Sequence, residues 1–309
     1  MGKVVIICPI FNEKENIIDF LYSISNYIND DVHLLLLDDF STDGSRELLQ
    51  KISQYNFLNV YFIFNDYNLG YGENLLRGFL WALEKGYEII LTIDADFQHL
   101  PSYIPIFINL AEKYEFITGS RYSFSSLKID EKNFFRYLIN KKMVEFVKSF
   151  FNVRITDFFC GFRAYRRDLL SYICKNLLAL KERRGLHFSY DFPIYLWIDL
   201  LSYGCVVKEF PIPFIFFTHR KFKGRSPFSE REGRSPFSKS EGRSPFSERE
   251  GRSPFSKSEG RSPFSESEEQ VNINNHYKRI KLYVDIFCWY YWERMGKKSL
   301  IGKDCWLRR

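Results

Sequence analysis

The sequence predicts an α/β fold in which a mainly parallel central sheet is covered by helices on both faces. Two observations predict this fold. Short, almost wholly apolar segments alternate with segments of helical length between residues 3 and 120, a pattern typical of strands buried on both faces of a parallel sheet. Polar side chains also follow four of these apolar segments directly, at the edge where open parallel sheets bind their ligands.

The elements of this first region can be placed in order. Strands are expected where apolar residues run together, at 4–10 (VVIICPI), 33–39 (HLLLLDD), 59–64 (NVYFIF), 88–94 (EIILTID) and 115–120 (EFITGS). Helices of about 10 to 15 residues are expected between them, at 13–28, 43–53, 73–86 and 101–113. The second helix follows Ser41, Thr42 and Asp43, which are residue types that cap helix N-termini.

The region after residue 120 is less regular. An amphipathic helix is expected at 134–153 and a second helix at 193–204, followed by a strand at 205–214. From Gly224 onward a nine-residue unit, GRSPFSERE or a close variant, occurs five times. Its only sizeable apolar side chain is one Phe, so we expect disorder, as a neutral insertion or as a docking or phosphorylation segment. The chain is therefore divided into an α/β domain (1–223), a repeat array (224–269) and a C-terminal segment (270–309).

The C-terminal segment contains the aromatic and basic stretch HYKRIKLYVDIFCWYYWERM, residues 276–295. Two interpretations of it remain open. It is either a helix packed on the core or a helix in a membrane interface, where Trp and Tyr with flanking Lys and Arg are favoured.

The composition limits the classes of function. Of 309 residues, 45% are hydrophobic and 18% aromatic, enough for a large core. A net charge of +6 is too small to indicate nucleic acid, but it suits an anionic small molecule or membrane surface. Six cysteines without a CxxC pair indicate reduced thiols. With no signal peptide and no apolar run of about 18 to 20 residues, we expect a cytoplasmic protein, at most peripheral to a membrane, and the oligomeric state stays open.

Oxygen ligands gather after the fourth expected strand, in TIDADFQHLP. Asp94, Asp96 and Gln98 occupy alternate positions there, and such oxygens suit Mg²⁺ or Mn²⁺. The alternative is a solvated loop whose aspartates cap the next helix. Asp39 ends the second expected strand, where a carboxylate can accept hydrogen bonds from a nucleobase. Together these positions indicate a site for a nucleoside diphosphate, although no GxxxxGK[ST] sequence is present.

Six ordered motifs carry a resemblance to a known family. PIFNEKENI, LLDDFSTDGS, NLGYGENLLRGF, DADFQHLP, TGSRY and TDFFCGFRAYRRDLL, within residues 3–226, resemble family 2 glycosyltransferases of the GT-A fold. The closest resemblance is to the dolichol-phosphate mannose synthase-like, or polyprenyl-phosphate sugar transferase, group. The resemblance implies an inverting, metal-dependent enzyme that moves one sugar from a nucleotide sugar, of the GDP-mannose or UDP-glucose type, to a polyprenyl phosphate at a membrane surface.

The resemblance also implies roles for individual residues. Arg121 and Asp191 join Asp96 as expected catalytic residues, and the metal ligands would be Asp94, Asp96 and Gln98. The residues expected to bind the nucleotide sugar are Pro9, Phe11, Glu13, Asp39, Asp94, Ala95, Arg220 and Lys221. The acceptor phosphate would be met by Arg121, Arg136 and Arg163.

Two departures from the family pattern matter. The GxSK signature reads Gly224-Arg225-Ser226-Pro227, with Pro in place of Lys, where the repeats begin. The family's acidic residue before its final glycine-containing element falls at about Tyr195, with Asp191 one helical turn earlier. Asp191 could replace it as the general base that a sugar hydroxyl acceptor needs, or it could simply cap a helix. A glycan acceptor in cell-surface polysaccharide synthesis and a non-catalytic scaffold therefore remain as alternatives.

Overall fold

One mixed sheet organises the molecule. A computed structural model describes residues 3–55, 57–123, 131–213, 280–291 and 294. The described strands form a seven-stranded sheet in the order β3-β2-β1-β4-β6-β5-β7. All neighbouring pairs are parallel except the two that include β6, which confirms the expected mainly parallel sheet. The strands are β1 (Val4–Ile10), β2 (Val32–Asp38), β3 (Val60–Phe64), β4 (Ile89–Thr92), β5 (Phe116–Ser120), β6 (Arg163–Arg166) and β7 (Val207–Pro211).

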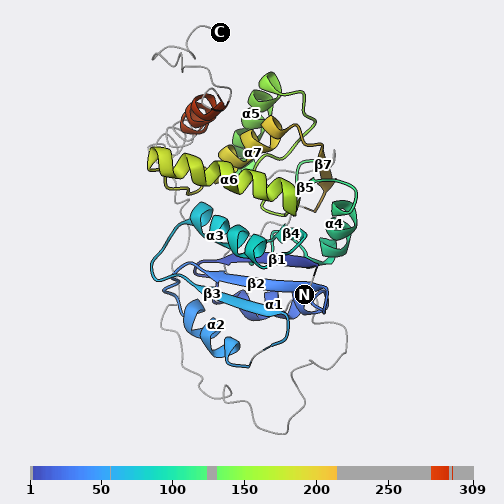
Figure 1. The fold of residues 1–309 in the computed structure, drawn as a ribbon, viewed down its shortest axis with the longest axis vertical. Helices are drawn as coiled ribbons and strands as arrows, with labels where there is room; N and C mark the ends of the chain where they lie inside the picture. The colour runs from blue at the N-terminus through green and yellow to red at the C-terminus, as the bar shows by residue number, and fades with distance from the viewer. Residues whose placement is uncertain (1–2, 56, 124–130, 214–279, 292–293, 295–309) are drawn as a thin grey trace, which may run out of the picture.

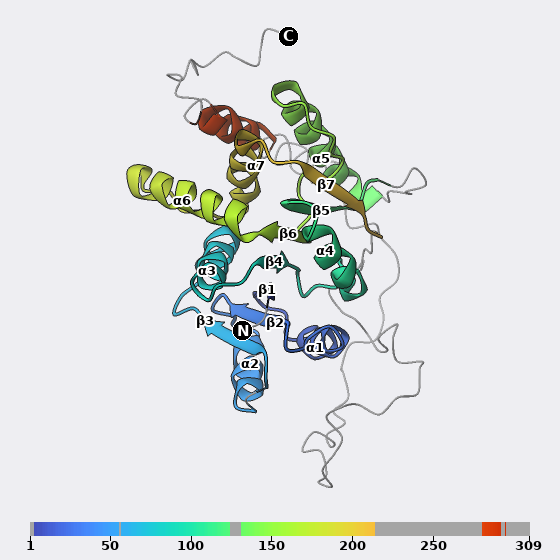
Figure 2. The same cartoon turned by 45° about the vertical axis from the view of Figure 1, so that its right-hand side comes forward.

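Helices cover both faces of this sheet (Figures 1 and 2). On one face α1 (Ile17–Ser25), α2 (Ser45–Ser53) and α4 (Ile104–Ala111), which follows the short 3₁₀ helix η1 (Pro101–Tyr103), share an apolar cluster with Val4 and Ile6 of β1. On the other face Val5 and Ile7 belong to a larger cluster. Its helices are α3 (Tyr71–Glu84), α5 (Glu131–Phe150), α6 (Arg167–Arg184) and α7 (Phe192–Tyr203). This alternation along β1 follows from the two-residue period of a strand.

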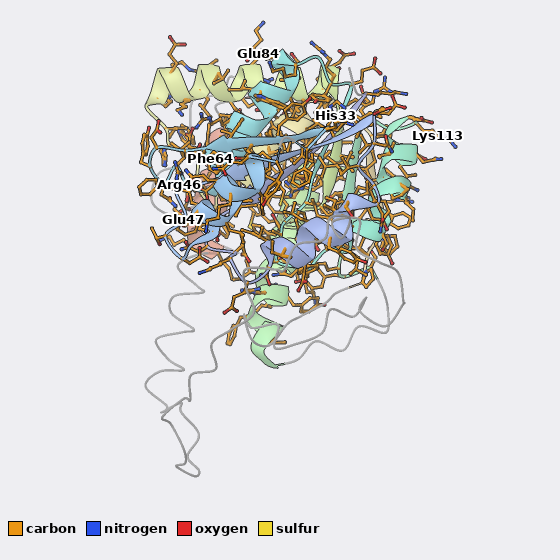
Figure 3. All side chains as sticks on the ribbon, turned by 90° about the horizontal axis from the view of Figure 1, so that it is seen from below. His33, Arg46, Glu47, Phe64, Glu84 and Lys113 are labelled. Carbon is orange, nitrogen blue, oxygen red and sulfur yellow. The ribbon has the colours of Figure 1, made fainter. Side chains whose placement is uncertain are left out.

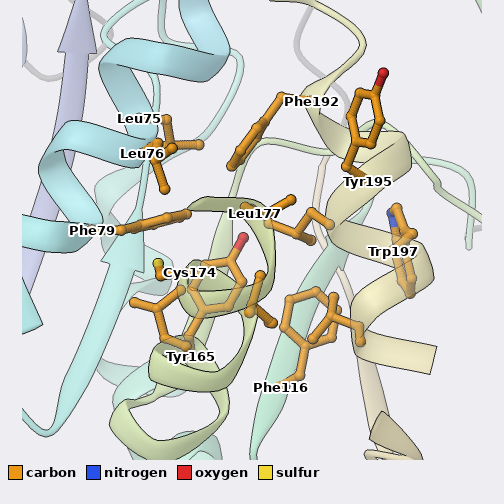
Figure 4. Close-up of a cluster of buried hydrophobic side chains, with 14 of the residues drawn as sticks. Leu75, Leu76, Phe79, Phe116, Tyr165, Cys174, Leu177, Phe192, Tyr195 and Trp197 are labelled. Carbon is orange, nitrogen blue, oxygen red and sulfur yellow. The ribbon is translucent and has the colours of Figure 1, made fainter. Parts of the chain in front are cut away.

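The larger cluster is rich in aromatic rings (Figure 4). Phe79 of α3 packs edge-on against Tyr165 of β6, with ring centroids 5.2 Å apart. Phe116 of β5 lies between Tyr165 and Trp197 of α7, with centroid distances of 5.2 Å and 5.4 Å. These contacts hold α3 and α7 against the same part of the sheet, so the segment before α7 lies beside the start of α3.

That segment is held by Glu73, in the first turn of α3. The Glu73 carboxylate accepts a hydrogen bond from the backbone N–H of Phe188 (3.0 Å) and pairs with Lys181 of α6. At Gly72 an added Cβ would lie 2.8 Å from the Ser189 carbonyl oxygen, so only glycine permits this approach. The result is that residues 188–190 lie over the N-terminal end of α3.

Two elements were absent from the prediction. β6 could not be expected from the sequence, because RAYR contains two arginines; antiparallel pairing with β4 and β5 contributes to its burial. Helix α6, in contrast, has a signal that could have revealed it. Its buried residues Leu169, Ile173, Leu177 and Leu180 recur at helical spacing, and Gly185 ends it with φ 63°.

The C-terminal segment contributes a helix at 280–291, drawn in dark red in Figure 1. Val284, Phe287 and Tyr290 are buried against the larger cluster, as the interpretation of a helix packed on the core expects. The Tyr290 hydroxyl donates to Asp199 of α7 (2.8 Å), and Arg294 Nε donates to the same carboxylate (2.9 Å). Within the described ranges, no helix is both long and apolar enough to span a bilayer. The repeat array at 224–269 lies outside those ranges.

Candidate functional site

A cavity of about 1300 Å³ opens at the edge where β1, β2 and β4 end. Nine of the residues expected in the site line it together: Pro9, Phe11, Glu13, Asp39, Asp94, Ala95, Asp96, Gln98 and Arg136. They come from the end of β1, from the loops after β1, β2 and β4, and from α5. Parallel strands deliver these loops to one place, because their carboxyl ends meet at the same edge of the sheet.

The carboxylates of Asp94 and Asp96 line the cavity together. Burial raises the pKa of Asp94, and repulsion from Asp96 raises it further. Burial also raises the pKa of Asp96, against the opposing effect of hydrogen bonds from Gln98. Those bonds come from the backbone N–H of Gln98 (3.0 Å) and from its side-chain Nε2 (2.6 Å). Two carboxylates that resist ionisation together favour a bound cation.

The position of the Asp94 carboxylate is restricted by Gly161, Thr92 and His99. An added Cβ at Gly161 would lie 2.5 Å from Asp94 Oδ2, so the Gly161 backbone is in direct contact with the carboxylate. Thr92 Oγ1 donates to the Gly161 carbonyl oxygen (2.6 Å) and fixes that backbone. His99 lies on the same side, with Nδ1 3.7 Å from Asp94 Oδ2. Burial lowers the pKa of His99 to about 3, and the charge of Arg121 lowers it further, so the ring is neutral.

Asp39 is held by the loop after β3. Asp39 Oδ1 accepts hydrogen bonds from the Leu69 backbone N–H (2.7 Å) and from Asn65 Nδ2 (2.8 Å). Asp39 Oδ2 accepts one from the Gly70 backbone N–H (2.8 Å). Gly70 has φ 80°, a conformation that glycine adopts without strain. The glycine-rich turn therefore serves to bind this carboxylate in the structure.

Two of the expected arginines are occupied elsewhere. Arg121 donates to Asp157 through Nε (2.7 Å) and Nη2 (2.9 Å). Burial alone would raise the pKa of Asp157, but the charge and hydrogen bonds of Arg121 outweigh it and hold that pKa below its usual value. Arg163 is 3% exposed and donates to the Phe158 carbonyl oxygen (3.0 Å). Neither arginine is among the described residues that line the cavity. The positive charge of each arginine nevertheless lowers the pKa of Asp94.

The remaining expected residues lie apart from the carboxylate pair. Asp191 precedes α7 and accepts a hydrogen bond from the Ser189 backbone N–H (2.9 Å); the cavity lining includes Ser189 and Tyr190 but not Asp191. Tyr195, which occupies the place of the family's acidic residue, is 4% exposed and packs against Phe188. Arg220 and Lys221 lie outside the described residues, so their proposed contact with the diphosphate stays a prediction.

Several residues of the rim were not predicted. Phe40, Tyr71 and Tyr190 line the cavity, and the rings of Tyr71 and Tyr190 stack with centroids 6.1 Å apart. Phe40 has φ 61°, an uncommon conformation for an aromatic residue. The ring of Phe40 lies over the guanidinium of Arg46. The guanidinium carbon of Arg46 also lies 5.4 Å from the ring centroid of Phe64 (Figure 3). These contacts join separate elements of the chain, so no pattern within one segment indicates them.

The residues at the cavity edge fit a divalent cation. In the described part of the chain, no three His, Cys, Asp or Glu side chains come together as a metal-binding group. The oxygen donors that could hold a cation at this edge are the carboxylates of Asp94 and Asp96 and the amide of Gln98. The Gln98 amide binds Asp96 through Nε2. Its Oε1 has no hydrogen bond to any described residue. Hard oxygen donors of this kind are typical of Mg²⁺ and Mn²⁺ sites, which leave positions open for phosphate oxygens.

Comparisons with known proteins agree with this geometry. Residues 5–174 match the family described as glycosyl transferase family 2. The chain is 28% identical over 213 residues to a polyprenol monophosphomannose synthase of Mycolicibacterium smegmatis, covering 69% of this chain and 77% of that protein. It is 25% identical over 218 residues to an undecaprenyl-phosphate mannosyltransferase of Micrococcus luteus, covering 69% and 84% of the two chains.

Solved structures support the fold. Glucosyl-3-phosphoglycerate synthase of Mycobacterium tuberculosis superimposes with a TM-score of 0.51 at 17% identity, over 70% of this chain and 73% of that one. The same enzyme in complex with Mn²⁺, UDP and glucosyl-3-phosphoglycerate gives a TM-score of 0.50 at 16% identity, over 69% and 70%. At these identities the similarity concerns the fold alone. This fold is the one that the six motifs predicted.

Proposed function

Because this chain belongs to glycosyl transferase family 2, we propose that it is an inverting, metal-dependent enzyme that transfers one sugar to a polyprenyl phosphate. The donor is a nucleotide sugar of the GDP-mannose or UDP-glucose type. That the chain is a glycosyltransferase follows from the family. The acceptor is inferred from relatives whose names specify polyprenol and undecaprenyl phosphate.

One observation carries this proposal: the Asp94–Asp96 pair shares a cavity with Asp39. In the proposal Asp39 binds the base, and Asp94, Asp96 and Gln98 hold Mg²⁺ or Mn²⁺. The cation, when bound, supplies Lewis-acid stabilisation of the negative charge that develops on the departing nucleoside diphosphate. Pro9, Phe11, Glu13 and Ala95 line the same cavity and enclose the rest of the donor.

The protein's cations have separate parts in this scheme. Arg136 of α5 lines the cavity and its side chain is exposed, so it is available to bind the acceptor phosphate. Arg121 keeps its bond to Asp157 and acts on the carboxylate pair through its charge, which lowers the pKa values of Asp94 and Asp96. Arg163 acts on Asp94 in the same way.

The chemistry of the acceptor favours a phosphate over a hydroxyl. A lipid monophosphate is largely anionic near neutral pH, since its second pKa is about 6, and it needs positioning more than deprotonation. A sugar hydroxyl needs a general base. Asp191 was the candidate base, but it binds the Ser189 N–H at the start of α7 and lies outside the cavity lining as described.

Transfer of radiolabel tests this proposal. Full-length protein is incubated with Mn²⁺, a labelled nucleotide sugar and a short polyprenyl phosphate, and the label is then partitioned between water and organic solvent. We expect label in the organic phase with the wild type and none with Asp96→Ala, which lacks one metal ligand.

The other outcomes separate the alternatives. Label that moves only onto a glycan would contradict the lipid acceptor and favour polysaccharide synthesis. No transfer and no Mn²⁺-dependent nucleotide binding, with a partner protein retained through residues 224–269, would favour the non-catalytic scaffold.

A further inference from the structure

The hydrogen bonds of Asp39 limit what its carboxylate can still recognise. A carboxylate has about four acceptor positions, two on each oxygen. In the described part of the chain three of them are taken. Asn65 Nδ2 and the Leu69 N–H occupy both positions on Oδ1, and the Gly70 N–H occupies one on Oδ2. One position remains, on Oδ2.

Asn65, which supplies the side-chain donor among the three, is itself firmly placed. Asn65 is 1% exposed, and its Nδ2 also donates to Asn74 Oδ1 (2.9 Å). Asn74 in turn donates to the Leu37 carbonyl oxygen of β2 (3.1 Å). Arg77 of α3 donates to Asn65 Oδ1. The Asp39 carboxylate is therefore part of a buried network that joins β2, the loop after β3 and α3, and Oδ1 cannot exchange its partners without breaking that network.

Guanine and uracil present different donors to such a carboxylate. Guanine offers two adjacent N–H groups, at N1 and at the exocyclic N2, which need one free acceptor position on each carboxylate oxygen. Uracil offers a single N–H, at N3, between two carbonyl groups. A carboxylate with one free position satisfies the donor of uracil but leaves one guanine N–H without a partner, and a buried donor without a partner weakens binding.

We propose that the donor is a uridine diphosphate sugar and that the saturation of Asp39 Oδ1 by Asn65 and Leu69 selects uracil over guanine. This inference rests on the proposed function, because it presupposes that Asp39 binds the base. The cavity also supplies the flat surfaces that a pyrimidine needs. Phe11 and Phe40 line the same cavity as Asp39 and are 46% and 42% exposed.

Calorimetric titration of the full-length wild-type protein with UDP and with GDP, each with Mn²⁺, tests the inference. We expect UDP to bind at least about tenfold more tightly than GDP, the factor that one unpaired N–H produces. A GDP affinity within tenfold of the UDP affinity, or above it, overturns the choice of base and leaves the proposed transferase intact. If neither nucleotide binds, the proposed function fails together with this inference.

Two matched asparagine variants test the cause of the selection. Asn65→Ala removes a donor from Asp39 Oδ1 and frees a second acceptor position, so the UDP-to-GDP affinity ratio should fall at least threefold. Asn68→Ala removes an amide that donates to the backbone carbonyl oxygen of Asp39 (3.2 Å), so the carboxylate keeps its three bonds and the ratio should stay that of the wild type. An unchanged ratio in folded Asn65→Ala, or an equal fall in both variants, overturns the mechanism of selection. The wild-type titration decides the base even if Asn65→Ala does not fold.

Discussion

Substitution of Gly161 by alanine displaces Asp94, the proposed metal ligand, without changing its carboxylate chemically. The new Cβ would lie 2.5 Å from Asp94 Oδ2 and 3.3 Å from its Cγ. Ordinary contacts begin at 3.4 Å, so the carboxylate must move by about 0.9 Å, because the Gly161 backbone is fixed by Thr92 and cannot retreat. The backbone of Gly161 does not have a left-handed φ, so alanine adds no backbone strain.

The size of the effect follows from that displacement. Misplacing a catalytic group by about 1 Å costs about a hundredfold in rate, which corresponds to about 2.7 kcal/mol of activation free energy. We therefore expect Gly161→Ala to lower kcat about a hundredfold and to weaken Mn²⁺ binding. Transfer of labelled sugar gives the first quantity, and titration calorimetry with Mn²⁺ gives the second.

A second glycine provides the control. In Gly119→Ala the new Cβ would lie 2.7 Å from Ile212 Cδ1 and 3.0 Å from Cys160 Sγ, which is similar crowding among groups that do not include Asp94. This variant should lose stability but keep the Mn²⁺ affinity of its folded fraction. Wild-type turnover and Mn²⁺ affinity in folded Gly161→Ala would refute the reasoning, since Asp94 would then tolerate displacement.

Three further predictions concern other parts of the chain. Asp157→Ala removes the carboxylate that pairs with the buried Arg121, so the free energy of unfolding measured in urea should fall by about 3 to 5 kcal/mol; a loss below about 1 kcal/mol would contradict a tight buried pair. Burial raises the pKa of Asp199 to about 6, above the ordinary aspartate value of about 4, so the folded state binds the proton more tightly than the unfolded state. Stability from this carboxyl is therefore fully present below about pH 4 and falls by about 3 kcal/mol as the pH rises through about 6. Asp199→Asn should remove that fall from the pH dependence of unfolding, and an identical pH slope in both proteins would show that Asp199 is not the cause. Deletion of four of the five repeats should leave turnover and the Tm nearly unchanged, because the repeats lack apolar surface for a core; a large drop in Tm would show that they pack.

The sequence predicted those parts of the fold in which each element has its own pattern. β1, β2 and β4 are uninterrupted apolar runs, so their positions agree with the structure to within two residues. β6 has no such pattern, because two of its four residues are arginines and its burial comes from the strands and helices that pack around it. Helix α6 does have a helical period, but its many charged residues make that period less obvious in the sequence.

The candidate site shows the same division. Asp39, Asp94, Asp96 and Gln98 could be predicted to meet because strand ends converge at one edge of a parallel sheet. The pairing of Arg121 with Asp157 could not, since the partners are 36 residues apart and belong to segments with no common pattern. The same limit applies to Phe40 and to the bonds around Asp39, because backbone N–H groups carry no sequence signature.

A crystal of the full-length protein soaked with Mn²⁺ and a nucleotide sugar tests the central claim most directly. We expect an anomalous manganese peak about 2 Å from oxygens of Asp94 and Asp96. The diphosphate should lie on the opposite side of the ion and the base beside Asp39. A bound nucleotide sugar whose manganese lies away from both carboxylates would contradict it.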